Sequence, residues 1–410
     1  MGRLPDIESD TDSYNGQSQR QFWTGTIIWC AIAYTCMLAI FMSVCFPDFS
    51  LLKLGFLPLL AHGSSPACFY AFSKSPKTFS KPKSIEIVAL VPFHQAHRTE
   101  ILDCYLRRNL VSSGGFLDRV VFLPQTNDTE SLEWLTSTVE RTSTYLISET
   151  TGSLFDVVSG VVNTLFLWID GNVVFIEGQT IPTMVKTKLD HPNSLIVSAN
   201  VINQAALERL HSHPSIALPY LPELQPAQSI EHDSWRASDL PPWKRPTEFH
   251  FRRGFSQLSE NHRWLPSGDE GFYHTPIGMS VYSDDGPNLE DWTVKAQQHY
   301  SFLHHLELDE LNRYKFPIWT NPTEPISTAF FFFASTDAET AEAFLQRNGS
   351  HTKVLKATEN EDQRTKDVII DGKGIAAHYS SEHGSRGLDD TDLLQRYRSY
   401  AREMVCPEIT

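Results

Sequence analysis

The 410-residue chain is short of basic residues and has no long basic cluster. It carries 34 Lys plus Arg against 49 Asp plus Glu, which gives a formal net charge of −15. Nucleic-acid-binding proteins present a basic surface to the phosphates. The composition therefore argues against nucleic acid as a partner. At the same time, 41% hydrophobic residues are enough to form a substantial core.

Cysteine is also scarce, with six residues in the whole chain. Three of them belong to one apolar segment near the N-terminus, and the other three are Cys68, Cys104 and Cys406. Their spacing does not match a thiolate metal site. A disulfide from either Cys68 or Cys104 to Cys406 remains open.

Charged residues are absent from residues 22–46, "FWTGTIIWCAIAYTCMLAIFMSVCF". Such a run is long enough to cross roughly 30 Å of hydrocarbon as a helix, and it is too long for the apolar region of a signal peptide. The alternative is a buried core helix. We predict an uncleaved transmembrane signal anchor, with residues 1–21 as a cytosolic tail and 47–84 as a stem.

The orientation of this anchor rests on weak signals. Arg20 and Lys53 flank the segment, so the positive-inside rule barely discriminates. Sequons at Asn127 and Asn348 would accept glycans if the large C-terminal part were luminal. We expect a single-pass type II glycoprotein of the Golgi or another secretory membrane.

Strand and helix patterns alternate from residue 85 to 406, which predicts βαβ crossovers and a mainly parallel sheet. Between 211 and 275 the pattern is replaced by a Pro- and aromatic-rich stretch with Trp235, Trp243 and Trp264. Such a long irregular segment inside a compact domain is usually functional, disordered or wrongly assigned. Strands are expected at 85–93, 119–125, 165–170 and 194–201, and helices at 98–113, 127–141, from 180, 288–310, 336–347 and 391–404.

The stretch "LFLWIDGNVVFIE" places Asp170, Gly171 and Asn172 directly after an apolar strand. Taken alone, Asp-Gly-Asn predicts a β-turn. However, an apolar strand ending in Asp-x-Asp, third in a βαβαβ series behind a membrane anchor, resembles the motif of GT-A glycosyltransferases. Residues 85–406 also resemble a group of fungal membrane proteins associated with such enzymes, through stretches such as "VALVPF", "RTEILDCYLRRNL" and "IIDGKGIAAHYSS". The resemblance implies a GT-A-like α/β fold, with flanking helices around the sheet and one N-terminal transmembrane helix before it.

The resemblance further implies a divalent cation, Mn²⁺ or Mg²⁺, that bridges the diphosphate of a nucleotide sugar. The cation ligands would be Asp170, Asn172 and His378, and Asp170 would also contact the nucleotide sugar. This chain departs from the motif because Asn172 stands where the last acid is expected, and an uncharged amide oxygen should bind a cation more weakly. The alternative for His378 is a structural histidine.

Ligands of open α/β sheets bind at the carboxyl ends of the strands. Pro92, Phe93 and Arg98 after the first strand, and Gln125 after the second, are therefore expected to meet the base and ribose. A surface pair with Glu100 is the alternative for Arg98.

A pair of acids, Glu290 and Asp291, precedes a predicted helix. Inverting GT-A enzymes place an acid near the acceptor hydroxyl as general base, which contributes on the order of 10²–10⁴-fold. Equally, acids in a first helical turn complement the helix dipole, with Asn288 as the cap. His299 is expected to lie on this helix without a site role.

These observations predict a glycosyltransferase that moves a sugar from a nucleotide sugar to a hydroxyl acceptor. The stretch with Trp235, Trp243 and Trp264 would then shape the side that binds the acceptor. Two alternatives remain. One is a catalytically silent GT-A-like scaffold of the secretory pathway, which Asn172 favours. The other is a membrane-bound tailoring enzyme of fungal secondary metabolism.

Overall fold

The computed structural model of the chain describes the parts of residues 79–406 that carry its regular structure. All of them belong to the second of two units, residues 66–410. The described ranges are 79–148, 157–158, 161, 163–224, 234–244, 262–282, 286–347, 366–379 and 386–406.

Several sequence predictions fall outside these ranges. The segment 22–46, the tail before it, Cys68 and Asn348 are not among the described residues. Within the described ranges, no helix combines the length and the apolar character that crossing a bilayer requires. The membrane anchor, the type II topology and the domain boundaries therefore stay predictions.

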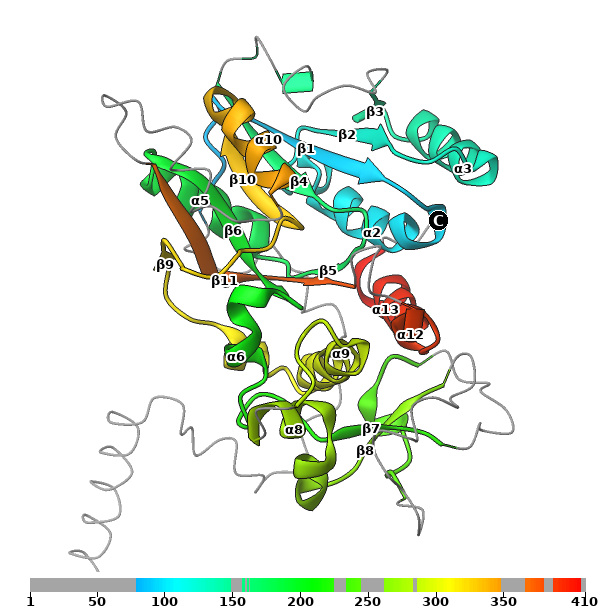
Figure 1. The fold of residues 1–410 in the computed structure, drawn as a ribbon. Coiled ribbons are helices and arrows are strands. Elements are labelled where there is room, and N and C mark those ends of the chain that lie inside the picture. The colour runs from blue at the N-terminus through cyan, green and yellow to red at the C-terminus, as the bar shows by residue number, and fades with distance from the viewer. Residues whose placement is uncertain are drawn as a thin grey trace, which may run out of the picture. The chain divides into compact units, whose positions relative to one another are not determined.

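A nine-stranded mixed sheet forms the centre of the described unit, in the order β3-β2-β1-β4-β10-β6-β11-β5, with β9 paired to β11 (Figure 1). β1 is parallel to β2 and β4, and β6 is parallel to β11. The strands are β1 (Glu86–Phe93), β2 (Arg119–Pro124), β3 (Tyr145–Ile147), β4 (Thr164–Ile169), β5 (Val173–Ile176), β6 (Ser194–Ile202), β9 (Trp319–Thr320), β10 (Phe330–Ala334) and β11 (Asp367–His378).

Helices cover this sheet, as the alternating pattern predicted (Figure 1). The continuous apolar runs of β1 and β6 are buried almost throughout, as expected for strands covered on both faces. The helices are α2 (Ala96–Asn109), α3 (Thr129–Glu140), α5 (Thr180–Asp190), α6 (Glu208–His211), α8 (Pro276–Tyr282), α9 (Trp292–Glu307), α10 (Ala338–Gln346), α12 (Arg386–Asp389) and α13 (Leu393–Tyr400). A mixed α/β fold with a mainly parallel sheet is confirmed.

The strand ranges predicted from the sequence correspond to β1, β2, β4 and β6, and β3 and β10 are among the strands that they do not include. β3 follows β2, so the strand before Asp170 is the fourth in the chain and not the third. β10, "FFFFA", lies antiparallel between β4 and β6 in the middle of the sheet. Its uniform apolar run carries no alternation that would mark it as a strand.

The irregular stretch from 211 to 275 contains a two-stranded ribbon, β7 (Tyr220–Pro222) with β8 (Trp264–Pro266). Trp235 and Trp264 are buried in the core, and the Trp243 indole donates to the Pro222 carbonyl at 3.0 Å. The two buried tryptophans therefore pack the interior and do not form an open acceptor surface.

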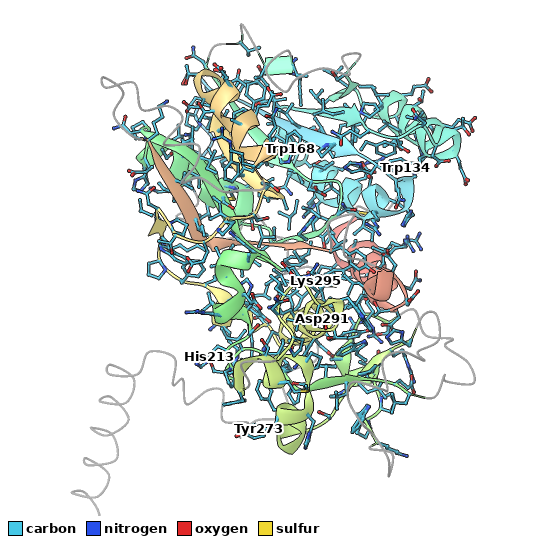
Figure 2. All side chains as sticks on the ribbon, in the orientation of Figure 1. Trp134, Trp168, His213, Tyr273, Asp291 and Lys295 are labelled. Carbon is cyan, nitrogen blue, oxygen red and sulfur yellow. A yellow bond between two sulfur atoms is a disulfide. The ribbon has the colours of Figure 1, made fainter. Side chains whose placement is uncertain are left out.

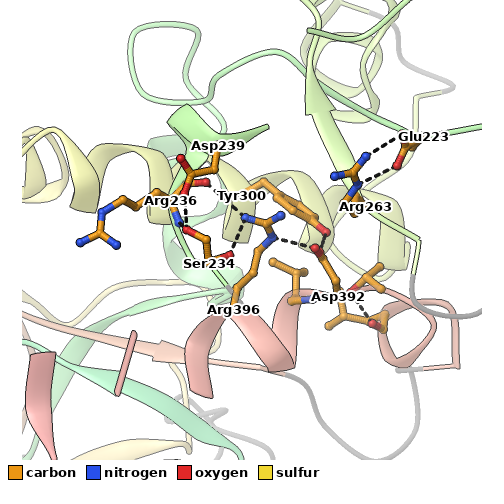
Figure 3. Close-up of polar contacts among 11 residues, drawn as sticks. Glu223, Ser234, Arg236, Asp239, Arg263, Tyr300, Asp392 and Arg396 are labelled. Atoms are coloured by element: carbon orange, nitrogen blue, oxygen red, sulfur yellow. Dashed lines mark hydrogen bonds and ion pairs between the residues drawn. The ribbon is translucent and has the colours of Figure 1, made fainter. Parts of the chain in front are cut away.

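A buried polar network ties this region to the C-terminal helices (Figure 3). The Arg396 guanidinium on α13 donates to the Ser234 carbonyl at 3.4 Å and to Asp392 at 2.9 Å, and the Tyr300 hydroxyl donates to the same Asp392 carboxylate. Arg263 on the ribbon binds Glu223 through two hydrogen bonds of 2.8 and 2.9 Å. Because all these groups are paired, their burial is compatible with a stable fold.

Cys104 on α2 forms a disulfide with Cys406, which is 302 residues further along the chain. Of the two pairings left open by the sequence, the structure contains the one from Cys104. The bond attaches the end of the described chain to the first helix of the sheet domain.

Candidate functional site

The site begins at the point where the sheet reverses its strand order. β2 lies on one side of β1 and β4 lies on the other, and open α/β sheets bind ligands at the carboxyl ends of the strands where the order reverses in this way. Phe93 ends β1, and Asp170 follows β4 directly. The Gln125 amide donates to the Phe93 carbonyl at 2.8 Å, so the backbone of Gln125 joins the same edge.

Asp170, Gly171 and Asn172 form the turn between β4 and β5. The Val173 amide donates to the Asp170 carbonyl at 3.0 Å. The backbone N–H of Asn172 donates to the Asp170 side-chain oxygen Oδ1 at 2.8 Å. The turn prediction is therefore confirmed, and it is compatible with a site because the turn lies at the ligand-binding edge of the sheet.

Gly171 allows this turn to pack against the end of β1. A Cβ atom added at Gly171 would lie 2.5 Å from the Pro92 carbonyl oxygen, closer than such atoms approach in proteins. The backbone of Pro92, expected to contact the nucleotide, thus supports the turn. An acid at position 171, as in a run of three acids, would not fit without a backbone shift.

Arg98 is the residue that reaches this turn from α2. It is 8% exposed, and its Nη1 donates to Asn172 Oδ1 at 2.8 Å. Its Nη2 donates to Asp389 at 2.8 Å, and the guanidinium lies 5.2 Å from the centre of the Tyr379 ring. The alternative pairing with Glu100 is wrong, because Glu100 forms ion pairs with Arg398 and Arg402.

His378, at the end of β11, faces Asp170. Its Nε2 lies 3.4 Å from Asp170 Oδ1, and the Asp170 side chain is 26% exposed. Burial opposes ionisation of Asp170. The contact with His378 and the hydrogen bond from the Asn172 backbone N–H favour ionisation more strongly, and the pKa of this carboxyl falls below its ordinary value. Asp170 is consequently an anion over the physiological pH range.

Two buried nitrogens at this edge are poorly satisfied among the described residues. Arg98 Nε has no hydrogen-bond partner, and His378 Nε2 has only the 3.4 Å contact with Asp170 Oδ1. Buried polar atoms are almost always satisfied in folded proteins, and those that are not often mark the place of a missing polar ligand. Both atoms belong to side chains that contact the Asp170–Asn172 turn, from α2 on one side and β11 on the other.

The residues do not fit the three-ligand cation site that the resemblance implied. The only oxygen that the Asn172 side chain offers accepts a bond from the Arg98 guanidinium, which puts a positive charge where a cation would stand. Asp170 and His378 remain as two donors. Among the residues that the structure describes, no group of three or more His, Cys, Asp or Glu side chains is arranged to hold a metal.

The predicted catalytic acids lie on a different element. Asp291 caps α9, and its Oδ1 accepts bonds from the Thr293 amide at 2.9 Å and the Thr293 hydroxyl at 2.8 Å. Asn288 accepts instead from the Glu290 amide at 3.0 Å, so the cap is Asp291 and not Asn288. Both acids are exposed, and Figure 2 shows Asp291 on α9, between the sheet and the β7–β8 ribbon.

His299 connects α9 to the site in a way that the sequence did not indicate. Its Nε2 lies 2.7 Å from Asn203 Nδ2, and its Nδ1 lies 2.7 Å from the Tyr397 hydroxyl. The Asn203 amide also donates to the His378 carbonyl at 3.3 Å. The ring is fully buried, so His299 supports the end of β11, and no spacing in the sequence marks it.

No family model and no curated protein sequence matches this chain. Some solved structures resemble it weakly. GalNAc-T7 with UDP, GalNAc and Mn²⁺ has 8% identity and a TM-score of 0.32, over 73% of this chain and 44% of that one. A CMP:2-keto-3-deoxy-manno-octonic acid synthetase complexed with CTP has 8% identity and a TM-score of 0.33, over 78% and 99%.

TarS from S. aureus has 15% identity and a TM-score of 0.22, over 28% of this chain and 35% of that one. The chain thus spans less than half the length of TarS and of GalNAc-T7. Similarities of this size carry no argument about function, which therefore rests on the geometry of the site.

Proposed function

We propose that the chain binds a nucleotide sugar at the edge formed by Phe93, Asp170 and His378 and transfers the sugar to a hydroxyl acceptor. The observation that carries the proposal is an ionised Asp170 at the reversal of strand order, in contact with His378 Nε2 and on the same turn that Arg98 reaches with a buried Nε that has no acceptor among the described residues. A donor with an anionic diphosphate and a polar ribose supplies acceptors for the nitrogens and a hydroxyl donor for the carboxylate.

In the proposed reaction, the acceptor hydroxyl attacks the anomeric carbon of the sugar. Its O–H bond breaks and a new glycosidic C–O bond forms. The bond from the anomeric carbon to the diphosphate oxygen breaks, and the nucleoside diphosphate leaves with the electron pair. Arg98 and His378 stabilise the leaving charge, while Asp291, whose Oδ2 is not used in capping α9, takes the proton.

The Arg98–Asn172 hydrogen bond favours a second candidate, the silent scaffold. Where a cation would otherwise bind, this chain has an internal contact between two buried side chains. A scaffold of this kind would retain the fold of the site and bind no donor.

An assay of nucleoside diphosphate release separates the two candidates. The purified full chain is mixed with UDP-glucose, UDP-N-acetylglucosamine and GDP-mannose in turn, with EDTA or with Mn²⁺. A transferase releases the nucleoside diphosphate from at least one donor, by transfer or by slow hydrolysis, and Asp170→Asn abolishes the release. Absence of release from every donor with both additions would favour the scaffold.

A further inference from the structure

A cleft lies beside the proposed donor site, since Trp134 in its wall is stacked on Phe93. It is enclosed by α2, α3 and the C-terminal turn η10 (Ala401–Val405), and its volume is about 500 Å³. None of its lining residues belongs to the Asp170–Asn172 turn or to β11. Four arginines line it, and we call it the arginine cleft: Arg107, Arg141, Arg398 and Arg402.

The arginine cleft is positive although the chain as a whole is acidic. Against four guanidinium groups, the lining contains two acids, Glu100 and Asp103. Glu100 is shared by Arg398 and Arg402. Asp103 pairs with Arg107 at 2.8 Å. Burial raises the pKa of Asp103 above its ordinary value despite the Arg107 charge.

Several guanidinium nitrogens in the cleft still lack an anionic partner. Arg141 donates to the Ser137 carbonyl at 2.9 Å and to the Ser137 hydroxyl at 3.0 Å, and both acceptors are uncharged. The Nε atom of Arg107 is buried without a hydrogen-bond acceptor among the described residues, and the buried Nε atom of Arg398 has only a 3.6 Å ion-pair contact with Glu100. Arg guanidinium groups in this state are suited to a phosphate, sulfonate or carboxylate.

The rest of the wall is apolar. It includes Ile101, Ala401, the Cys104–Cys406 disulfide and the Trp134 ring. Trp134, on α3 (Figure 2), is stacked on Phe93 with ring centres 6.0 Å apart and an angle of 4° between the planes. A ligand of the cleft therefore meets guanidinium groups and an aromatic surface together.

We propose that the arginine cleft binds a small organic anion with an apolar or aromatic body. The cleft volume suits one such molecule. The proposal does not depend on the proposed transfer reaction, since it rests on other residues. Because Trp134 is stacked on Phe93, a ligand in contact with Trp134 would be separated from the carboxyl end of β1 by the Trp134 ring.

The test uses 1-anilinonaphthalene-8-sulfonate as the probe and the purified full chain as the protein. The probe combines one sulfonate with an aromatic body. Wild type is compared with the double variant Arg141→Gln plus Arg402→Gln, since both side chains are at the exposed rim and their loss should leave the fold intact. The matched control is Arg119→Gln, an exposed arginine on β2 that does not line the cleft.

The proposal predicts saturable binding by wild type with one probe per chain. The double variant should bind about tenfold more weakly, which corresponds to about 1.4 kcal/mol, while Arg119→Gln matches wild type. The neutral analogue N-phenyl-1-naphthylamine should bind equally weakly to all three, and saturating UDP should not displace the sulfonate. Equal affinity of wild type and the double variant for the sulfonate, or its displacement by UDP, would overturn the proposal.

Discussion

Arg98 Nη1 donates a hydrogen bond to the Asn172 side-chain oxygen at 2.8 Å, across 74 residues of sequence. The bond joins the first helix of the sheet domain to the turn where an Asp-x-Asp motif would end. It also explains how an amide is accommodated there, since Asn172 is buried and its side-chain oxygen accepts a hydrogen bond from the buried Arg98 guanidinium.

Replacing Arg98 should destabilise the fold. Arg98→Met leaves Asn172 Oδ1 without its donor and Asp389 without its ion-pair partner. We expect a loss of about 2–4 kcal/mol in the free energy of unfolding, measured by urea denaturation. The control is Arg119→Gln, which breaks an exposed pair with Glu86 and should cost about 0–1 kcal/mol. Equal losses in the two variants would contradict a structural role for Arg98.

Restoring the acid at Asn172 should change the response of the site to cations. In Asn172→Asp, the new carboxylate can contact Arg98 and can also ligate a cation that is held by Asp170 and His378. The variant should therefore bind Mn²⁺ at least about tenfold more tightly than wild type. Isothermal titration calorimetry of both proteins provides the measurement. Asn127→Asp, at an exposed position before α3, is the matched control. If the variant and the control bind Mn²⁺ alike, the Asp170 edge is not a latent cation site.

Gly171 should not tolerate a side chain. Gly171→Ala places its Cβ 2.5 Å from the Pro92 carbonyl oxygen, which is too close, so the turn or the end of β1 has to move. We expect a loss of about 1–3 kcal/mol in stability together with weaker donor binding. Chemical denaturation and a nucleotide titration on the same sample give the two values. A variant with wild-type stability would show that the turn is free to shift away from β1.

Stability should fall between pH 7 and pH 5 because of two buried histidines. Burial lowers the pKa of His299 to about 3 and that of His211 to about 3. Both rings stay neutral in the folded state, while the unfolded chain takes up protons near the ordinary value of about 6.5. Their stabilising contribution is therefore complete above that value and is lost as the pH falls, by about 2 kcal/mol for each ring at pH 5.

The check is the urea midpoint as a function of pH for wild type and His299→Gln. The variant should lose a large part of the slope between pH 7 and pH 5, although it is less stable at pH 7. His191→Gln, at an exposed position, should retain the wild-type slope. An unchanged slope in His299→Gln would show that this ring does not set the pH dependence.

Much of the fold was predictable from the sequence. In a chain where strands and helices alternate, continuous apolar runs such as those of β1 and β6 form strands that are buried on both faces. β10 could not be recognised, since "FFFFA" fits a buried strand and a buried helix equally well. The antiparallel insertion between β4 and β6 depends on pairing over long sequence distances, which no local pattern encodes.

The candidate site was only partly predictable for a similar reason. Strand ends can be found from where apolar residues give way to polar ones, and this located Phe93, Asp170 and His378. The partners of these residues come from elsewhere in the chain: Arg98 contacts Asn172 and Asp389, and His299 contacts Asn203. Such contacts depend on packing, and packing cannot be inferred from spacing alone.

Thermal unfolding in the presence of nucleotide sugars tests the central claim most directly. The full chain, Asp170→Ala and the control Asp190→Ala, an exposed acid paired with Lys186, are heated with UDP-glucose, UDP-N-acetylglucosamine or GDP-mannose, each with EDTA or Mn²⁺. Binding at about 100-fold excess over the dissociation constant contributes about 2.7 kcal/mol. The account predicts a rise of about 3 °C in Tm with at least one donor for wild type and Asp190→Ala, and none for Asp170→Ala. A wild-type Tm unmoved by every donor, or an equal rise in Asp170→Ala, would contradict a nucleotide-sugar site at the end of β4.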